Sequence, residues 1–148
     1  MANKIMPPTF FYLGISLIVA LHFIFPIMQA IYYPYTLFGI LLITFGAVID
    51  IMAWKLFVKN KTTQNPFKYP SKLITIGVYR ASRNPMYLGM LVFLLGLAVL
   101  MGSLIAFIFP VIFFIIMEKK FIPLEEKNME KQFGKKYRKY KSEVRRWI

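Results

Sequence analysis

Polar and charged side chains gather at residues 77–89, directly before a long apolar run. Asn84 and Pro85 suit the start of a helix, because asparagine is a good N-cap and proline fits the first turn. Arg83 stands beside this helix start, whose free backbone N–H groups attract anions. The pattern indicates a site for a carboxylate or a phosphate, with a purely structural helix start flanked by an interfacial arginine as the alternative.

A pair of carboxylates, Glu125 and Glu126, follows Pro123 in a strongly basic part of the chain. Such a pair can hold an amine or another cationic group, although acids in the first turn of a helix also stabilise its dipole. Asp50 lies inside an apolar stretch, where an acid is costly and is treated as functional by default. We expect it to pair with a lysine or an arginine.

The sequence argues against metal and nucleotide chemistry of the common kinds. It has no cysteine and one histidine, His22, which excludes thiol catalysis and makes a zinc site improbable; we expect His22 to be a packing residue. Neither glycine-rich nucleotide-binding motif occurs. We therefore expect no metal among the ligands of this chain.

Long uncharged stretches indicate the helices that must position these residues. No charged residue lies between Lys4 and Asp50, or between Arg83 and Glu118. A bilayer needs roughly 20 apolar residues per helix, so we predict an all-α, polytopic membrane protein with about four transmembrane helices. The predicted spans are about 10–29, 36–58, 86–101 and 103–117, in a single domain covering residues 1–148. The last two form a hairpin broken at Gly102, because a single helix there would overshoot the bilayer.

Charge placement predicts the orientation. Residues 60–83 and the tail after Glu118 are both basic, so the positive-inside rule places them, and both termini, in the cytoplasm. Apolar residues recur at helical spacing in the tail, which predicts an amphipathic cytoplasmic helix that lies on the membrane or folds back over the spans. The net charge of +13 then indicates contact with membrane lipids and not with nucleic acid.

Several of these segments, taken in order, resemble a known family. Arg83-Asn-Pro-Met-Tyr-Leu-Gly89, Glu125-Glu126, Phe133-Gly134, Tyr137, Tyr140 and Val144-Arg-Arg-Trp-Ile148 resemble the isoprenylcysteine carboxyl methyltransferases and the related phospholipid methyltransferases. The resemblance implies an integral membrane enzyme that uses S-adenosylmethionine (SAM). It implies a cofactor site at the cytoplasmic face, formed by residues 62–89 and 118–148, and a lipid or another lipophilic small molecule as acceptor.

The resemblance also implies roles for single residues. Catalytic roles fall on Arg83, Asn84 and Glu126. Cofactor contacts fall on Gln64, Ser71, Lys72, Leu73, Ile74, Tyr79, Asn84, Pro85, Met86, Tyr87 and Glu125. Asn84 replaces a histidine of the eukaryotic members, and asparagine cannot act as a general base near neutral pH. Phe121 replaces a substrate-side arginine, so we expect an acceptor other than a prenylcysteine carboxylate.

Two other functions compete with methyl transfer. A membrane reductase using NADPH would share a similar C-terminal region, but such proteins have more spans. A non-catalytic membrane protein, such as a transporter subunit, would need polar residues in the middle of the membrane, and the sequence offers His22, Gln29 and Asp50. Binding of SAM or of NADPH would separate the two enzymes.

Overall fold

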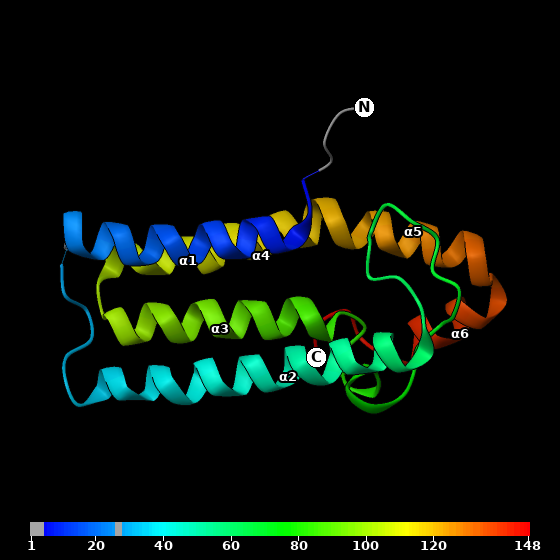
Figure 1. Cartoon of the computed structure of the whole chain (residues 1–148), viewed down its shortest axis with the longest axis horizontal. Helices are drawn as coiled ribbons and strands as arrows, with labels where there is room; N and C mark the ends of the chain where they lie inside the picture. The colour runs from blue at the N-terminus through cyan, green and yellow to red at the C-terminus, as the bar shows by residue number, and fades with distance from the viewer. Residues whose placement is uncertain (1–4, 26–27) are drawn as a thin grey trace.

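The computed structural model describes residues 5–25 and 28–148, and these residues form helices without a β-strand. Helices α1 (Pro7–Ile24), α2 (Phe38–Asn60), α3 (Pro85–Met101) and α4 (Ile108–Ile116) lie side by side in an elongated bundle (Figure 1). The predicted all-α fold is confirmed. The first predicted span, 10–29, differs at both ends: α1 begins at Pro7 and ends at Ile24, while residues 26–27 lie outside the described residues.

Among the described residues, two helical segments are long and apolar enough to cross a membrane, namely Pro7–Ile24 and Tyr35–Asn60. The second joins the short 3-10 helix Tyr35–Leu37 to α2. Only 17% of the residues in each apolar window are buried inside the protein, so most of these side chains point outward. An outward apolar surface suits contact with lipid, where the helix satisfies its own backbone hydrogen bonds.

The apolar run after Arg83 is a hairpin and not one long helix. Helix α3 ends at Gly102, which adopts a left-handed conformation with φ of 72° and donates its N–H to the carbonyl of Ala98. Glycine takes this conformation without a steric penalty, which makes it a common helix terminator. The chain then passes through a 3-10 helix, Leu104–Phe107, and returns in α4.

The helix that contains the fourth predicted span continues beyond Met117. Helix α4 continues through a π-helical turn, Met117–Phe121, into α5 (Ile122–Phe133). Pro123 lies in the first turn of α5, and a proline crowds the carbonyl four residues before it, here that of Lys119. Lys119 belongs to the wider π turn, which accommodates the proline without ending the helix. The predicted single tail helix is instead divided at Gly134, after which α6 (Lys135–Glu143) folds back.

Helices α2 and α3 approach each other through glycines. Gly39 and Gly46 of α2 face Gly96 and Gly89 of α3, and the two glycines of each helix lie about two turns apart. A Cβ atom at Gly46 would lie 2.6 Å from the carbonyl oxygen of Gly89. Small residues at such contacts let helix backbones pack directly in membrane proteins. This contact fixes the start of α3 beside α2.

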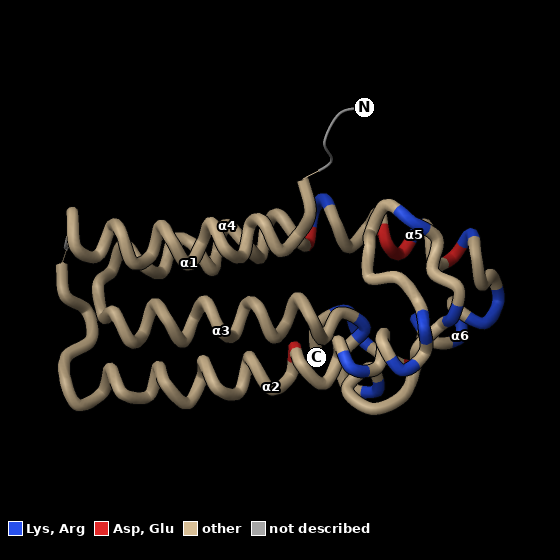
Figure 2. Tube along the Cα trace, viewed as in Figure 1, with Lys and Arg blue, Asp and Glu red and all other residues tan. Residues whose placement is uncertain are grey.

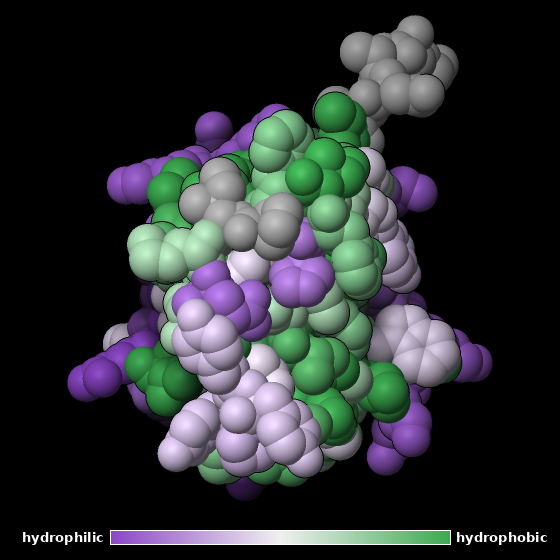
Figure 3. Space-filling view, turned by 90° about the vertical axis from the view of Figure 1, so that its left-hand side faces the viewer, coloured by the Kyte–Doolittle hydropathy of each residue, from purple (hydrophilic) through white to green (hydrophobic). Residues whose placement is uncertain are grey.

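Charge divides the molecule into two ends. Figure 2 shows Lys and Arg gathered at the end that carries α5, α6 and the loop between α2 and α3. The opposite end, which faces the viewer in Figure 3, mixes hydrophobic and pale, weakly polar residues with a few hydrophilic ones near its centre. Tyr32, Tyr33 and Tyr35 are exposed. Tyrosine is favoured at the boundary between membrane and water.

Candidate active site

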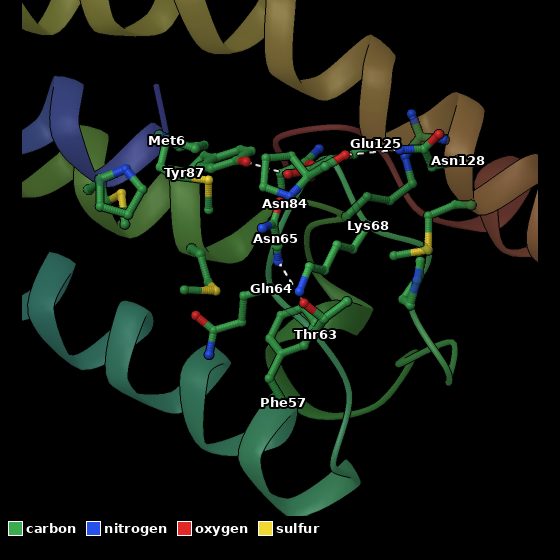
Figure 4. Close-up of a pocket in the computed structure, with 18 of the residues that line it drawn as sticks. Met6, Phe57, Thr63, Gln64, Asn65, Lys68, Asn84, Tyr87, Glu125 and Asn128 are labelled. Carbon is green, nitrogen blue, oxygen red and sulfur yellow. Dashed lines mark hydrogen bonds between the residues drawn. The ribbon is translucent and has the colours of Figure 1, made fainter. Parts of the chain in front are cut away.

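A cavity of about 160 Å³ lies at the charged end, between the start of α1, the end of α2, the following loop, the start of α3 and α5 (Figure 4). A smaller cavity adjoins it and shares part of its wall. The shared wall residues are Phe57, Tyr79, Arg83, Asn84, Glu125 and Met129. Segments that are distant in the sequence therefore enclose one composite pocket.

Most of the residues predicted to contact a cofactor line one of these two cavities. The larger cavity is lined by Gln64, Tyr79, Asn84, Met86, Tyr87 and Glu125. The smaller one adds Lys72, Leu73 and Ile74. Ser71 and Pro85 line neither: Ser71 is an exposed loop residue, and Pro85 is buried in the first turn of α3.

The loop before α3 is ordered by its own polar side chains. Thr62 Oγ1 accepts hydrogen bonds from the backbone N–H groups of Ser71 (3.0 Å) and Lys72 (3.3 Å). Asn65 Oδ1 accepts one from the N–H of Phe67 (2.9 Å). Such short polar side chains replace the regular hydrogen bonds that a loop lacks. Asn128 of α5 donates to the carbonyl of Pro66 (2.9 Å), which fastens the loop over the pocket.

Glu125 is the acid of the larger cavity. The hydroxyl of Tyr87 donates a hydrogen bond to its Oε1, and no described Lys or Arg forms an ion pair with it. Burial raises the pKa of the Glu125 carboxyl to about 7, although the bond from Tyr87 lowers it in part. A carboxylate in this environment is well suited to binding a cationic ligand, because such a ligand would supply the missing positive charge.

Tyr79 forms an aromatic wall between the two cavities. Its ring packs edge to face against Phe57, with 5.8 Å between centroids, and the hydroxyl of Tyr140 donates to its backbone carbonyl (2.6 Å). Burial, and then the nearby Glu125 carboxylate, raise the pKa of the Tyr79 hydroxyl above its ordinary value. Tyr79 therefore stays neutral and offers a ring face and a hydroxyl to a ligand.

Glu126 binds cationic side chains instead of facing the larger cavity. Its oxygens lie 2.9 Å from Arg83 Nη2, 2.9 Å from Arg146 Nη2 and 3.3 Å from Lys141 Nζ. Burial by itself raises the pKa of Glu126, but the hydrogen bonds from Arg146 and the charge of Arg83 outweigh it, and the net pKa is lowered. Glu126 is therefore ionised at neutral pH.

The three residues predicted to be catalytic contact residues 141–147. Arg83 donates its backbone N–H to the carbonyl of Arg145 (3.0 Å), and Asn84 donates its side-chain amide to that of Arg146 (2.9 Å). Asn84 occupies the N-cap position of α3, as predicted, but its side chain does not cap the helix. Arg83, Asn84 and Glu126 are thus all bound to residues 141–147, and Arg83 and Asn84 also form part of the cavity wall.

Two partners of this cluster were absent from the predicted site. Arg146 bonds to Glu118, and Trp147 donates its indole N–H to the other oxygen of Glu118 (2.9 Å). The signal in the sequence was the adjacent Arg-Arg-Trp, whose charge and size suit a docked segment, but nothing in the sequence shows which acid receives it.

The remaining candidates lie apart from the pocket. Asp50 sits in α2 beside Gly89 and lines neither cavity. The expected pairing is not observed: no described Lys or Arg forms an ion pair with Asp50, and its Oδ1 is buried without a hydrogen bond. His22 Nδ1 lies 3.1 Å from Ser103 Oγ at the other end of the bundle, as a packing residue would. Among the described residues, no cluster of three acids or histidines offers a metal site.

Comparisons with known proteins bear on these elements. The model of a family described as phospholipid methyltransferase matches residues 34–136, from the residue before Tyr35 to the start of α6. An uncharacterized protein of Haemophilus influenzae is 38% identical to this chain over 63 residues, which are 43% of this chain and all of that relative. The matched family range contains Glu125, Tyr79 and Tyr87.

Proposed function

This chain belongs to the phospholipid methyltransferase family, a membrane methyltransferase family, and on that premise we propose that it transfers a methyl group from SAM to a lipophilic acceptor at the cytoplasmic face. The observation that carries the proposal is Glu125, an acid without a cationic partner among the described residues, in a cavity walled by aromatic and methionine side chains. The family match gives no support to the reductase or to the transporter subunit.

The residues of the pocket fit the chemical groups of SAM. Glu125 would hold the ammonium of its amino-acid part, and the faces of Tyr79 and Phe57 would lie against the sulfonium or the adenine, since aromatic rings attract cations. When bound, SAM supplies a methyl group on a positively charged sulfur. The protein must then align the acceptor with that methyl group and exclude water, which accounts for much of the rate enhancement in transfers of this kind.

The apolar part of the larger cavity suits a lipophilic acceptor. Met6, Pro7 and Pro8 at the start of α1, together with Met86 and Met90 of α3, form that part of the wall. Phe121 occupies the position at which the related enzymes have a substrate-side arginine. It is fully buried and packs on Phe10 and Phe67. A carboxylate acceptor would need a fixed cation, and Arg83 is already bound to Glu126.

We expect labelled SAM to transfer its methyl group to a membrane lipid fraction and not to a farnesylcysteine analogue. The physical reason is that the wall formed by Met6, Pro7, Pro8, Met86 and Met90 is apolar. The measurement is a methyl-transfer assay in which both acceptors are offered to the purified protein. Methylation of the farnesylcysteine carboxylate alone would contradict the choice of acceptor while leaving methyl transfer intact.

We expect Glu125→Gln to weaken binding of S-adenosylhomocysteine, because one charge-assisted hydrogen bond to its ammonium is lost. Such a bond contributes about 1.5–3 kcal/mol. Calorimetry on the purified protein measures it. Glu130→Gln is the control, since Glu130 lines neither of the two cavities and the ion pair that it forms with Arg138 among the described residues is 4.0 Å long. Equal affinities of the two variants would rule out Glu125 as the ammonium ligand.

The pH dependence of S-adenosylhomocysteine binding gives a second test of the role of Glu125. Its pKa is raised to about 7, so its charged form increases as the pH rises from about 6 to 8 and the affinity should rise about tenfold. The stability of the free protein should change in the opposite sense. A carboxyl whose pKa is raised by folding makes its full contribution to stability below its ordinary pKa of 4.5, and this contribution is lost as the pH rises to about 7. Glu125→Gln should flatten both curves.

We expect residues 64 and 135 to lie on the same, cytoplasmic side of the membrane. Both belong to the basic end of the bundle, and anionic lipid and the positive-inside rule favour that side. Cysteines introduced as Gln64→Cys and Lys135→Cys are labelled with a membrane-impermeant thiol reagent in sealed vesicles of known orientation. Labelling from opposite sides would contradict the hairpin of two crossings between them.

A further inference from the structure

Few charged residues line the larger cavity. Among its described lining residues they are Lys68, Arg83 and Glu125. Arg83 is bound to Glu126 at 2.9 Å and to the carbonyl of Lys141 at 3.4 Å, so its charge is already compensated. Neither Lys68 nor Glu125 takes part in an ion pair with a described residue. The cavity therefore presents one uncompensated cation and one uncompensated anion.

The backbone at Lys68 is held in place, although its side chain is exposed. Its N–H donates to the carbonyl of Asn65 (3.0 Å), and the Asn65 side chain closes the turn through the N–H of Phe67 (2.9 Å). Asn128 of α5 donates to the carbonyl of Pro66 (2.9 Å). The lysine thus projects from an ordered turn that is fastened to the helix bearing Glu125 (Figure 4).

A cation and an anion at one cavity fit a ligand that carries both an ammonium and an anionic group. We propose that Lys68 binds the carboxylate of the cofactor's amino-acid part while Glu125 binds its ammonium. This assignment rests on the proposed function. The start of α3, which the sequence analysis considered for an anion, has fewer free donors than an ordinary helix start, because Pro85 has no N–H and the N–H of Asn84 already donates to Ser82 Oγ at 3.1 Å.

Two ligands that differ in the amino-acid part test the assignment. S-adenosylhomocysteine carries both charges, whereas methylthioadenosine keeps the nucleoside and the sulfur and lacks the amino acid. Their affinities are measured by calorimetry for the wild-type protein, for Lys68→Met and for Lys61→Met. Lys61 is an exposed lysine of the same loop that lines neither cavity, so it is the matched control.

Lys68→Met should weaken binding of S-adenosylhomocysteine about tenfold, leave methylthioadenosine unchanged and be rescued in part by Lys68→Arg. Lys61→Met should change neither affinity. Equal weakening of both ligands would show that Lys68 shapes the cavity, and would overturn the proposal. Unchanged binding of S-adenosylhomocysteine combined with lost methyl transfer to a zwitterionic phospholipid would overturn it too, because the lysine would then serve the acceptor headgroup. A wild-type protein that binds neither ligand would refute the proposed function itself.

Discussion

Gly46→Ala will destabilise the protein by about 1–3 kcal/mol, because the new methyl group meets backbone and not flexible side chains. A Cβ at Gly46 lies 2.6 Å from the carbonyl oxygen of Gly89 and 2.6 Å from the backbone nitrogen of Phe93. Neither atom can move unless α2 and α3 separate. The measurement is thermal unfolding in detergent, followed by near-UV circular dichroism.

Gly14→Ala is the matched control for this change. A Cβ at Gly14 meets only side-chain methyl groups of Leu94, at 3.3 and 3.5 Å, and a leucine rotamer can adjust by that amount. The intrinsic preference of alanine for helices then offsets part of any cost. Gly46→Ala should also weaken ligand binding, because the same helix contact positions Tyr87 at the start of α3. Similar unfolding temperatures for the two variants would refute the proposed tight helix contact.

Glu126→Gln will release residues 141–147 from the pocket at a cost of about 3 kcal/mol, because Arg83 and Arg146 lose the charge that compensates them. The Arg83 side chain is only 9% exposed, so water cannot replace the carboxylate there. The expected result is a lower unfolding temperature and faster proteolytic cleavage near Lys141. Both can be measured on the purified protein.

Glu143→Gln is the control for Glu126. The pair of Glu143 with Lys139 is exposed and 3.9 Å long, and such pairs contribute little to stability. The pH gives a further check. Folding lowers the pKa of Glu126, so its contribution is present above its ordinary value of 4.5 and is lost as the pH falls through the folded value. Acid should therefore destabilise the wild type more than Glu126→Gln; the opposite order would contradict this role.

The helices and the segments that build the pocket follow from residue patterns. Long uncharged stretches require helices that satisfy their own hydrogen bonds, and the glycine at 102 marks the reversal between two of them. The family resemblance implied that residues 62–89 and 118–148 form one site, and the hydrogen bond from Asn128 to Pro66 joins these two segments. These features depend on local preference and on length, which a sequence displays directly.

Other features depend on partners that only the folded chain brings together. Glu125 and Glu126 are adjacent acids, yet one faces a cavity and the other binds two arginines, because successive helix positions point in different directions. The glycines of α2 and α3 show their spacing in the sequence, but the pairing of Gly46 with Gly89 becomes visible only in three dimensions. Lys68 is one of 19 basic residues, and its position at the cavity sets it apart.

The uninterrupted passage from α4 through the π turn into α5 makes one rod out of the apolar bundle and the helix that bears Glu125. A helical rod transmits displacement along its axis, since each turn is bonded to the next. In a bilayer, the thickness of the hydrocarbon layer sets how far such a rod protrudes, and thinner or thicker membranes shift it at modest cost. On the proposed function, the composition of the surrounding lipid would thereby be coupled to the height of Glu125 above the membrane.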